Sequence, residues 1–165
     1  MLMQVSLKDG PARFSPQICY EGIDPEFTRA GANLGADFIL NVTNDSWFGE
    51  DAEPYIHFMI TAFRPIELRI PLVRATNTGF SGVVDVAGRI AVRSNLFKAE
   101  NIETEFKFPS PEDRKKLPVF AEPTFYARHG EWFASLCVLL SLFMGLALFA
   151  PAFVIRLKDR KKIPR

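Results

Sequence analysis

The segment GADFILNVTNDSWFG, residues 35–49, decides the fold class of this chain. Residues 38–42 form a short apolar run, and such a run bounded by turn residues is typical of a buried β-strand. Gly35 precedes the run at the end of a helical stretch, and residues 43–45 follow it with polar side chains. This pattern predicts a strand inside a layered α/β domain, with a polar exit at one edge of the sheet.

Helices are predicted on both sides of that strand. Pro25 suits the first turn of a helix that runs to about Leu34, with Asp24 as its N-cap. A second helix is predicted from Pro54 to Arg69, bent at Pro65. Further strands are predicted at residues 5–7, 12–14, 17–20, 71–76, 80–86, 89–93 and 102–108. The order of these elements predicts a layered α/β sheet. The first predicted elements lack structural partners of their own, so we expect the chain to begin inside a domain.

The C-terminal region has the composition of a membrane segment. Residues 132–155 contain no charged side chain, and this length is enough to cross a hydrocarbon core of about 30 Å. Residues 156–165 hold six of the 20 basic side chains and one acid. The positive-inside rule predicts that this tail is cytoplasmic and that residues 1–131 lie on the opposite, periplasmic face. The alternative is a buried core helix, although core helices are usually shorter and amphipathic.

Four regions are therefore expected along the chain. They are a partial α/β domain at 1–109, a charged and Pro-rich linker at 110–131, a transmembrane helix at 132–155 and a basic tail at 156–165.

Charge and cysteine content exclude several classes of protein. Without its last ten residues the chain carries 14 basic and 18 acidic side chains, which gives no basic stripe and excludes nucleic acid as a partner. The two cysteines are far apart, and Cys137 lies inside the apolar segment, so two free thiols are expected. His57 and His129 are isolated, which predicts no metal site, and no cofactor is expected.

Cys19 is the candidate nucleophile. It ends an apolar strand and precedes a predicted helix, where nearby backbone amides favour a thiolate. The backbone N–H of Tyr20 is placed to bind an oxyanion, and Glu21 is close enough to orient a ligand or to tune the charge of the site. The alternative reading is that Cys19 is a small buried hydrophobic residue, as most free cysteines are.

Several stretches of the chain resemble the nitrilase superfamily and, within it, the apolipoprotein N-acyltransferase family. They are ICYE at 18–21, GAD at 35–37, NVTNDSWFG at 41–49, RPIE at 64–67, PLVRATNTG at 71–79, DVAGRI at 85–90 and YARHGE at 126–131. The resemblance runs from about Val5 to the tail. The Trp-Phe-Gly loop and the terminal apolar segment distinguish this branch from soluble nitrilases and amidases.

The resemblance implies a fold and an activity. The fold is α/β, the C-terminal half of a nitrilase-like αββα sandwich followed by one transmembrane helix, in a bacterial inner membrane with the soluble part periplasmic. Enzymes of this kind take an acyl chain from a phospholipid onto the cysteine as a thioester, then pass it to the N-terminal amine of a diacylglyceryl-cysteine lipoprotein. Cys19 matches the nucleophile and Glu21 a required acidic neighbour, while Tyr20, Trp47 and Phe48 match aromatic positions near the pocket mouth.

Other polar residues are expected to have structural roles. Asn44 and Asp45 are expected to fix their loop through local backbone hydrogen bonds. Arg74 and Asn77 end a strand and are expected to brace the site, and His57 is expected to be a surface or satisfied residue.

The family mechanism needs two further groups, a glutamate base and a lysine that stabilises the oxyanion, both upstream of the cysteine. Before Cys19 this chain has one lysine, Lys8, and one acid, Asp9, in a predicted turn. We therefore expect a fragment that is inactive alone and has the missing N-terminal half as a partner. Two alternatives stay open, a nitrilase-type amidase and a non-catalytic membrane-anchored subunit or pseudoenzyme.

Overall fold

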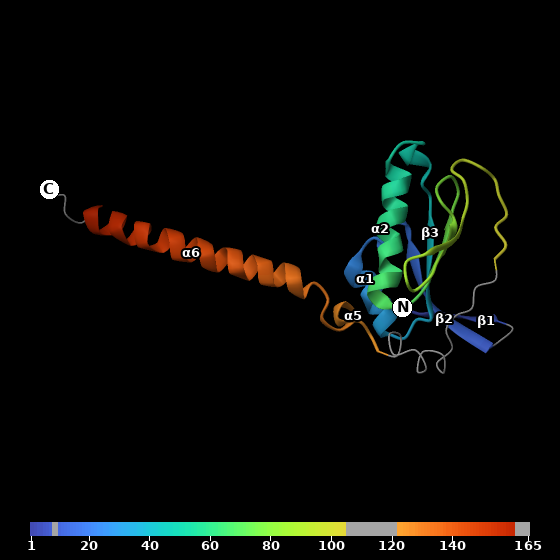
Figure 1. The fold of residues 1–165 in the computed structure, drawn as a ribbon, viewed down its shortest axis with the longest axis horizontal. Coiled ribbons are helices and arrows are strands. Elements are labelled where there is room, and N and C mark those ends of the chain that lie inside the picture. The colour runs from blue at the N-terminus through green and yellow to red at the C-terminus, as the bar shows by residue number, and fades with distance from the viewer. Residues whose placement is uncertain (8–9, 105–121, 161–165) are drawn as a thin grey trace. The chain divides into compact units, whose positions relative to one another are not determined.

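The computed structural model describes residues 1–7, 10–104 and 122–160, with side chains as far as Phe149. It divides the chain into two compact units, Met1–Gly130 and a second that begins at Glu131 (Figure 1). The first unit contains a six-stranded sheet in the order β1-β2-β3-β4-β5-β6. Its strands are β1 (Met3–Leu7), β2 (Gly10–Ile18), β3 (Phe38–Thr43), β4 (Leu72–Thr76), β5 (Gly82–Val84) and β6 (Ile90–Arg93).

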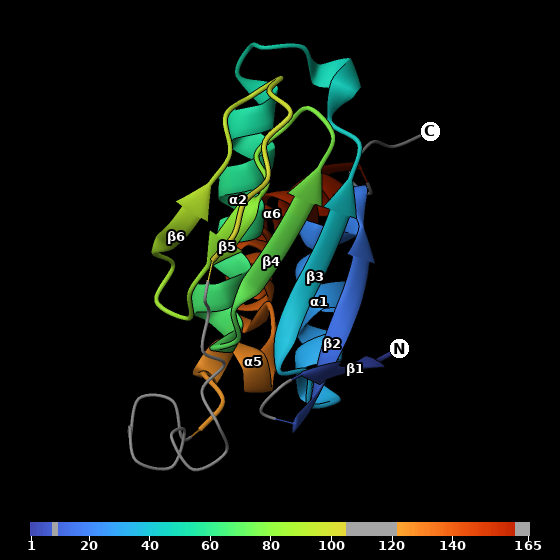
Figure 2. The ribbon, with the colours of Figure 1, turned by 90° about the vertical axis from the view of Figure 1, so that its right-hand side faces the viewer.

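The sheet is mixed, with a parallel centre and antiparallel edges. Strands β2, β3 and β4 are parallel neighbours, while β1, β5 and β6 each run antiparallel to the strand beside them. The parallel strands are connected through α1 (Pro25–Asn33) and α2 (Glu53–Leu68). Both helices lie on the same face of the sheet (Figure 2). This arrangement confirms the predicted α/β class.

Local signals explain where the helices begin and end. The Asp24 carboxylate accepts hydrogen bonds from the backbone N–H groups of Glu26 and Phe27 at 2.9 and 3.0 Å, so Asp24 is the N-cap of α1 as predicted. Gly35 follows α1 with φ +95°, a conformation that glycine adopts without strain. Helix α2 runs through Pro65 and ends before Arg69, which is left-handed at φ 60°.

An apolar core lies between the sheet and the helices. A short helix α5 (Phe125–His129) closes one end of it, and both Arg29 and Asn33 of α1 donate hydrogen bonds to the carbonyl of Ala127. The buried core residues are Ala36, Ile39, Phe58, Ala62, Leu68, Ile70, Leu72, Phe80, Val84 and Ala127. This core fixes the central strands, and their carboxyl ends carry the candidate site.

The two faces of the central strands differ in polarity. Toward the helices the strand ends bury polar side chains, namely Ser15, Gln17, Asn41, Thr43 and Arg74. The opposite face, which we call the open face, is apolar: Phe14 stacks on Phe38 with ring centroids 5.3 Å apart, and Ile18 and Val42 are exposed. The polar groups of the site therefore lie on the helix side of the sheet.

Most predicted strands are present with modest changes. The hairpins β1–β2 and β5–β6 form as expected. The predicted strands at 12–14 and 17–20 are one strand that ends at Ile18, and Cys19 opens a short 3₁₀ helix, η1 (Cys19–Gly22). Of the predicted strand at 102–108, residues 102–104 are not in a strand and the others lie outside the described residues.

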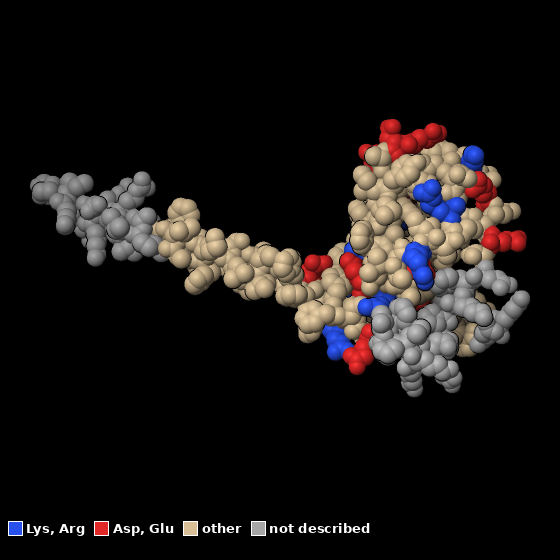
Figure 3. All heavy atoms as spheres, in the orientation of Figure 1, with Lys and Arg blue, Asp and Glu red and all other residues tan. Residues whose placement is uncertain are grey.

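The second unit is the helix α6 (Trp132–Arg160). The stretch Trp132–Phe149 has a mean hydropathy of 2.2, and within the described residues it is the one helix long and apolar enough to cross a membrane. Figure 3 shows an uncharged surface along its described part. The helix continues five residues beyond the predicted end at Ile155, and residues 110–121 of the predicted linker and 161–165 of the tail lie outside the described ranges.

Candidate active site

Cys19 lies at the carboxyl end of β2, where the chain turns sharply. The strand ends at Ile18, which pairs with Val42 of β3, and η1 begins at the next residue. Cys19 has φ 52°, a left-handed conformation that costs a non-glycine residue about 1–2 kcal/mol. Such conformations cluster at functional sites, where surrounding contacts hold them in place. Cys19 is thus at a strand-to-helix turn, as expected, and its role as a nucleophile stays a prediction.

Glu21 helps to hold this turn. Its Oε2 accepts a hydrogen bond of 2.7 Å from the backbone N–H of Ile18, directly before the cysteine. The bond links the last residue of the strand to η1. In this structure the carboxylate therefore shapes the backbone around Cys19, and its contact with a ligand stays a prediction.

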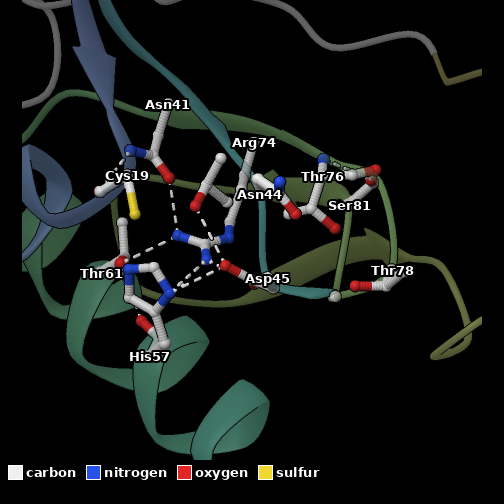
Figure 4. A network of polar contacts seen from close by, with 12 residues as sticks. Cys19, Asn41, Asn44, Asp45, His57, Thr61, Arg74, Thr76, Thr78 and Ser81 are labelled. Carbon is white, nitrogen blue, oxygen red and sulfur yellow. Dashed lines mark hydrogen bonds and ion pairs between the residues drawn. The ribbon is translucent and has the colours of Figure 1, made fainter. Parts of the chain in front are cut away.

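Arg74 of β4 is the centre of a buried polar network behind the cysteine. Its Nη1 donates to Asn41 Oδ1 at 2.6 Å and to Thr61 Oγ1 at 3.1 Å. Its Nη2 donates to Asp45 Oδ2 at 3.0 Å. Arg74 is 2% exposed and its three partners are completely buried (Figure 4). The arginine thus ties together the ends of β3 and β4 and the helix α2, as its predicted bracing role requires.

His57 and Asp45 complete the network. Nδ1 of His57 lies 3.1 Å from Asp45 Oδ1 and 3.0 Å from Arg74 Nη2. Asp45 Oδ1 also accepts a hydrogen bond from Thr43, and the backbone N–H of Asp45 donates to Asn77 Oδ1 at 3.1 Å. The local role predicted for Asp45 was therefore incomplete, because its carboxylate is the buried counter-ion of Arg74.

Asn44 does fix its loop locally, as predicted. Its Oδ1 accepts a hydrogen bond of 3.1 Å from the backbone N–H of Ser46 and another from the Ser46 hydroxyl. Asn77 Nδ2 donates to the same oxygen at 2.7 Å, so the loops after β3 and β4 are bridged.

Burial and the charges of the network change two pKa values. Burial by itself raises the pKa of Asp45, but the hydrogen bond from His57 and the positive charge of Arg74 outweigh it and hold that pKa below its usual value. Burial lowers the pKa of Arg74, while the negative charges of Asp45 and of an ionised Cys19 act to raise it. The guanidinium is thus close enough to Cys19 for an electrostatic interaction.

Asp45 is expected to make folding stability depend on pH. Because its pKa is lower in the folded chain, its contribution to stability is complete above the ordinary Asp pKa of about 3.9 and is lost as pH falls through the folded value. Asp45→Asn should therefore flatten the fall in unfolding free energy as pH decreases below about 4. Denaturant titrations at several pH values measure this slope. Asp51→Asn, at an exposed position in the following loop, is the control and should keep the pH slope of the parent chain. If Asp45→Asn also kept the slope of the parent chain, the role given to Asp45 would be contradicted.

Two of the three predicted aromatic residues form one wall beside the cysteine turn. The Tyr20 ring stacks on His57 with centroids 5.3 Å apart, and Phe48 meets the edges of both rings. A pocket opens there, lined by Tyr20, Ile23, Phe48, Glu53, Ile56, His57 and Ile60. Trp47, in the 3₁₀ turn η2 (Ser46–Phe48), is 77% exposed and does not line this pocket. The structure thus brings Tyr20 and Phe48 together, while Trp47 is free to contact a partner.

Three members of the site were not predicted as such from the sequence. Asn41 and Thr61 were given no role, and His57 was expected to be a surface or satisfied residue; His57 is buried, and all three contact Arg74. Two features of the sequence point to these residues. Asn41 is a polar residue within an apolar strand, and His57 and Thr61 are four residues apart, which places them on the same face of α2.

Comparison with known proteins identifies the family. Residues 2–112 match the profile of the carbon-nitrogen hydrolase family. The chain is 38% identical over 133 residues to an apolipoprotein N-acyltransferase of Geobacter metallireducens, covering 81% of this chain and 23% of the relative. It is 41% identical over 131 residues to the protein of the same name in Bdellovibrio bacteriovorus, covering 79% of this chain and 22% of the relative.

The chain therefore spans less than a quarter of the length of these relatives. Among solved structures, a carbon-nitrogen hydrolase from Helicobacter pylori superposes with a TM-score of 0.57 at 18% identity, over 70% of this chain and 48% of that one. This likeness supports the fold alone. The family profile shows that the chain belongs to the carbon-nitrogen hydrolase family, in the nitrilase superfamily, and its sequence is similar to those of apolipoprotein N-acyltransferases.

Proposed function

We propose that this chain is the nucleophile-bearing part of an apolipoprotein N-acyltransferase, with Cys19 as the acyl carrier. The observation that carries the proposal is the place of Cys19, in a left-handed turn at the end of β2, next to Tyr20, which lines a pocket formed mainly by aromatic and aliphatic side chains. Sequence similarity to proteins of that name supports the class of substrate.

The reaction has two transfers. In the first, the Cys19 thiol gives its proton to the general base, Sγ attacks the acyl carbonyl carbon of a phospholipid, and the ester C–O bond breaks as the lysophospholipid alcohol leaves with that proton. In the second, the N-terminal amine of a diacylglyceryl-cysteine lipoprotein attacks the thioester carbonyl carbon, the C–S bond breaks, and the proton lost by the amine restores the Cys19 thiol as the amide forms. Covalent catalysis of this kind divides one slow transfer into two faster ones, and a thioester is reactive toward an amine.

Each predicted site residue has a part in this scheme. Glu21 holds the turn around Cys19 through Ile18, and Tyr20 and Phe48 provide the apolar wall. The exposed Trp47 is proposed to contact lipid, since Trp favours the interfacial region of a bilayer. We place the sheet domain in the periplasm and the C-terminus in the cytoplasm, with α6 in the inner membrane. The glutamate base and the oxyanion-binding lysine would come from another part of a longer protein.

Intact-mass and peptide mass spectrometry test this proposal. The full-length gene product, in its membrane, is incubated with a phospholipid that carries a labelled acyl chain. The expected result is the mass of one acyl group on the peptide that contains Cys19, removed by hydroxylamine as a thioester is. The 165-residue chain alone is expected to show no acyl group, because Lys8 and Asp9 are poor substitutes for the base and the lysine.

The alternatives predict different outcomes in the same assay. A nitrilase-type amidase would release ammonia from simple amides and take no acyl group from phospholipid. A non-catalytic subunit would do neither in the full-length protein. Either outcome would contradict acyl transfer by Cys19.

A further inference from the structure

The carbonyl of Cys19 is held by a side chain from the neighbouring strand. Nδ2 of Asn41 donates to the Cys19 carbonyl oxygen at 3.1 Å and makes a longer contact of 3.5 Å with the carbonyl of Gln17. Asn41 pairs with Gln17 in the β2–β3 register, at the point where regular pairing is about to end. Its side chain thus continues the hydrogen bonding between the strands one step into the turn, where φ of Cys19 is 52°.

The orientation of this amide is set by Arg74. Guanidinium groups only donate hydrogen bonds, so the atom of Asn41 that lies 2.6 Å from Arg74 Nη1 must be its oxygen. The nitrogen is then forced to face the carbonyls of Gln17 and Cys19. Arg74 is itself held by Asp45 and Thr61, so neither the Asn41 amide nor the Arg74 guanidinium can turn without breaking a buried hydrogen bond.

The amide also fits tightly against the turn. A methyl group added at the Cα of Gly22 would lie 2.7 Å from Asn41 Nδ2, 3.1 Å from its Cγ and 3.1 Å from Thr61 Cγ2, so the closest contact is with the amide. Such a contact is closer than side chains tolerate, so position 22 must be glycine for Asn41 to reach Cys19. The turn and the amide are therefore matched in shape as well as in hydrogen bonding.

We propose that Asn41 is a positioning residue for Cys19. Its amide nitrogen holds the left-handed backbone that places Sγ, and Arg74 keeps the amide in the required orientation. The hydrogen bond from Asn41 goes to the backbone carbonyl of Cys19, so Asn41 acts through the position of Cys19 and not on the reacting groups. The inference rests on the proposed role of Cys19 for its catalytic meaning, but its structural content can be tested without any reaction.

The structural test observes the backbone of Cys19 directly. With Cys137→Ser, the full chain in detergent has one cysteine, and isotope-labelled cysteine gives one set of NMR signals whose Cα and Cβ shifts report φ. Asn41→Asp keeps an acceptor for Arg74 but presents an oxygen to the two carbonyls. We expect the Cys19 signals to move out of the left-handed range. Gly22→Ala should move them as well, because it displaces the amide and alters no polar group.

Thr61→Val is the matched control. It removes hydrogen bonds of Thr61 to Arg74 and to the carbonyl of His57 but keeps the bond from Asn41 to the Cys19 carbonyl, so the Cys19 signals should remain left-handed. Two results would overturn the proposal. One is unchanged Cys19 signals in both Asn41→Asp and Gly22→Ala; the other is a shift in Thr61→Val as large as in Asn41→Asp. If Asn41→Asp does not fold, Gly22→Ala alone decides.

A kinetic measurement separates this inference from the proposed function. In the full-length protein, Asn41→Asp is expected to lower kcat for thioester formation by at least about ten-fold with little change in KM, because small displacements of a reacting group cost that much or more. If the parent protein forms no thioester, the proposed function fails and the NMR result still stands. If the Cys19 NMR signals move but kcat keeps its parental value, Asn41 does not position Cys19 for the reaction.

Discussion

Replacing Arg74 by methionine is expected to lower the free energy of unfolding of the sheet domain by about 3–5 kcal/mol. The guanidinium is 2% exposed and is the positive partner of the completely buried Asp45 carboxylate. Removing it leaves that carboxylate without a compensating charge, and it also removes the donors to Asn41 and Thr61. Chemical denaturation of the parent and variant chains, under the same detergent conditions, measures the difference.

Arg89→Met is the matched control for this prediction. Arg89 also pairs with an aspartate, Asp85 at 2.7 Å, but its side chain is 82% exposed. Exposed ion pairs contribute at most about 1 kcal/mol, so this variant should change stability little. A loss of equal size in the two variants would show that burial of the Arg74 pair is not the source of the effect. Adding Asp45→Leu to Arg74→Met should recover part of the loss, since no unpaired charge then remains.

Cys19→Ser is expected to lower the rate of lipoprotein N-acylation by at least about a thousand-fold, if Cys19 carries the acyl group. Serine has nearly the shape of cysteine, so the turn between β2 and η1 should be kept. A hydroxyl is a far weaker nucleophile at neutral pH than a thiolate, and an oxygen ester is less reactive toward an amine than a thioester. Acyl transfer by the full-length protein, followed by mass spectrometry of the lipoprotein N-terminus, measures the loss.

The second cysteine provides the control for that experiment. Cys137 lies in α6, outside the sheet domain, and Cys137→Ser should leave the rate at its parental value. N-acylation at the parental rate by Cys19→Ser would mean that another group carries the acyl chain. Comparing the thermal unfolding of the two variants distinguishes a chemical loss from a folding defect.

The sequence predicts the elements of the fold better than the contacts of the site. The strand at 38–42, the cap at Asp24 and the two hairpins depend on short-range patterns, and each is present. The left-handed turn at Cys19 carries no such signal, because the residue at that position is not glycine. Glu21 holds the turn locally, but its other support, the Asn41 amide, lies on the next strand, and no local pattern specifies it.

The contacts of the network around Arg74 are likewise not specified by local sequence patterns. Its bonds join residues that are 13 to 33 positions apart, so they exist only after β3, α2 and β4 have packed together. A bracing role for Arg74 was predictable from its place at the end of a strand. Its partners Asn41, His57 and Thr61 were not predictable as members of the network, because an ordinary structural role explains each of them when it is considered alone.

The open face of the sheet has a consequence for temperature. Ile18 and Val42 are 72% and 50% exposed there, beside the stacked rings of Phe14 and Phe38. Covering such a surface removes water from apolar groups, which lowers the heat capacity and makes the driving force weaker on cooling. Association through this face should therefore be marked by a negative heat-capacity change, loosen in the cold and respond little to added salt, which mainly screens charge.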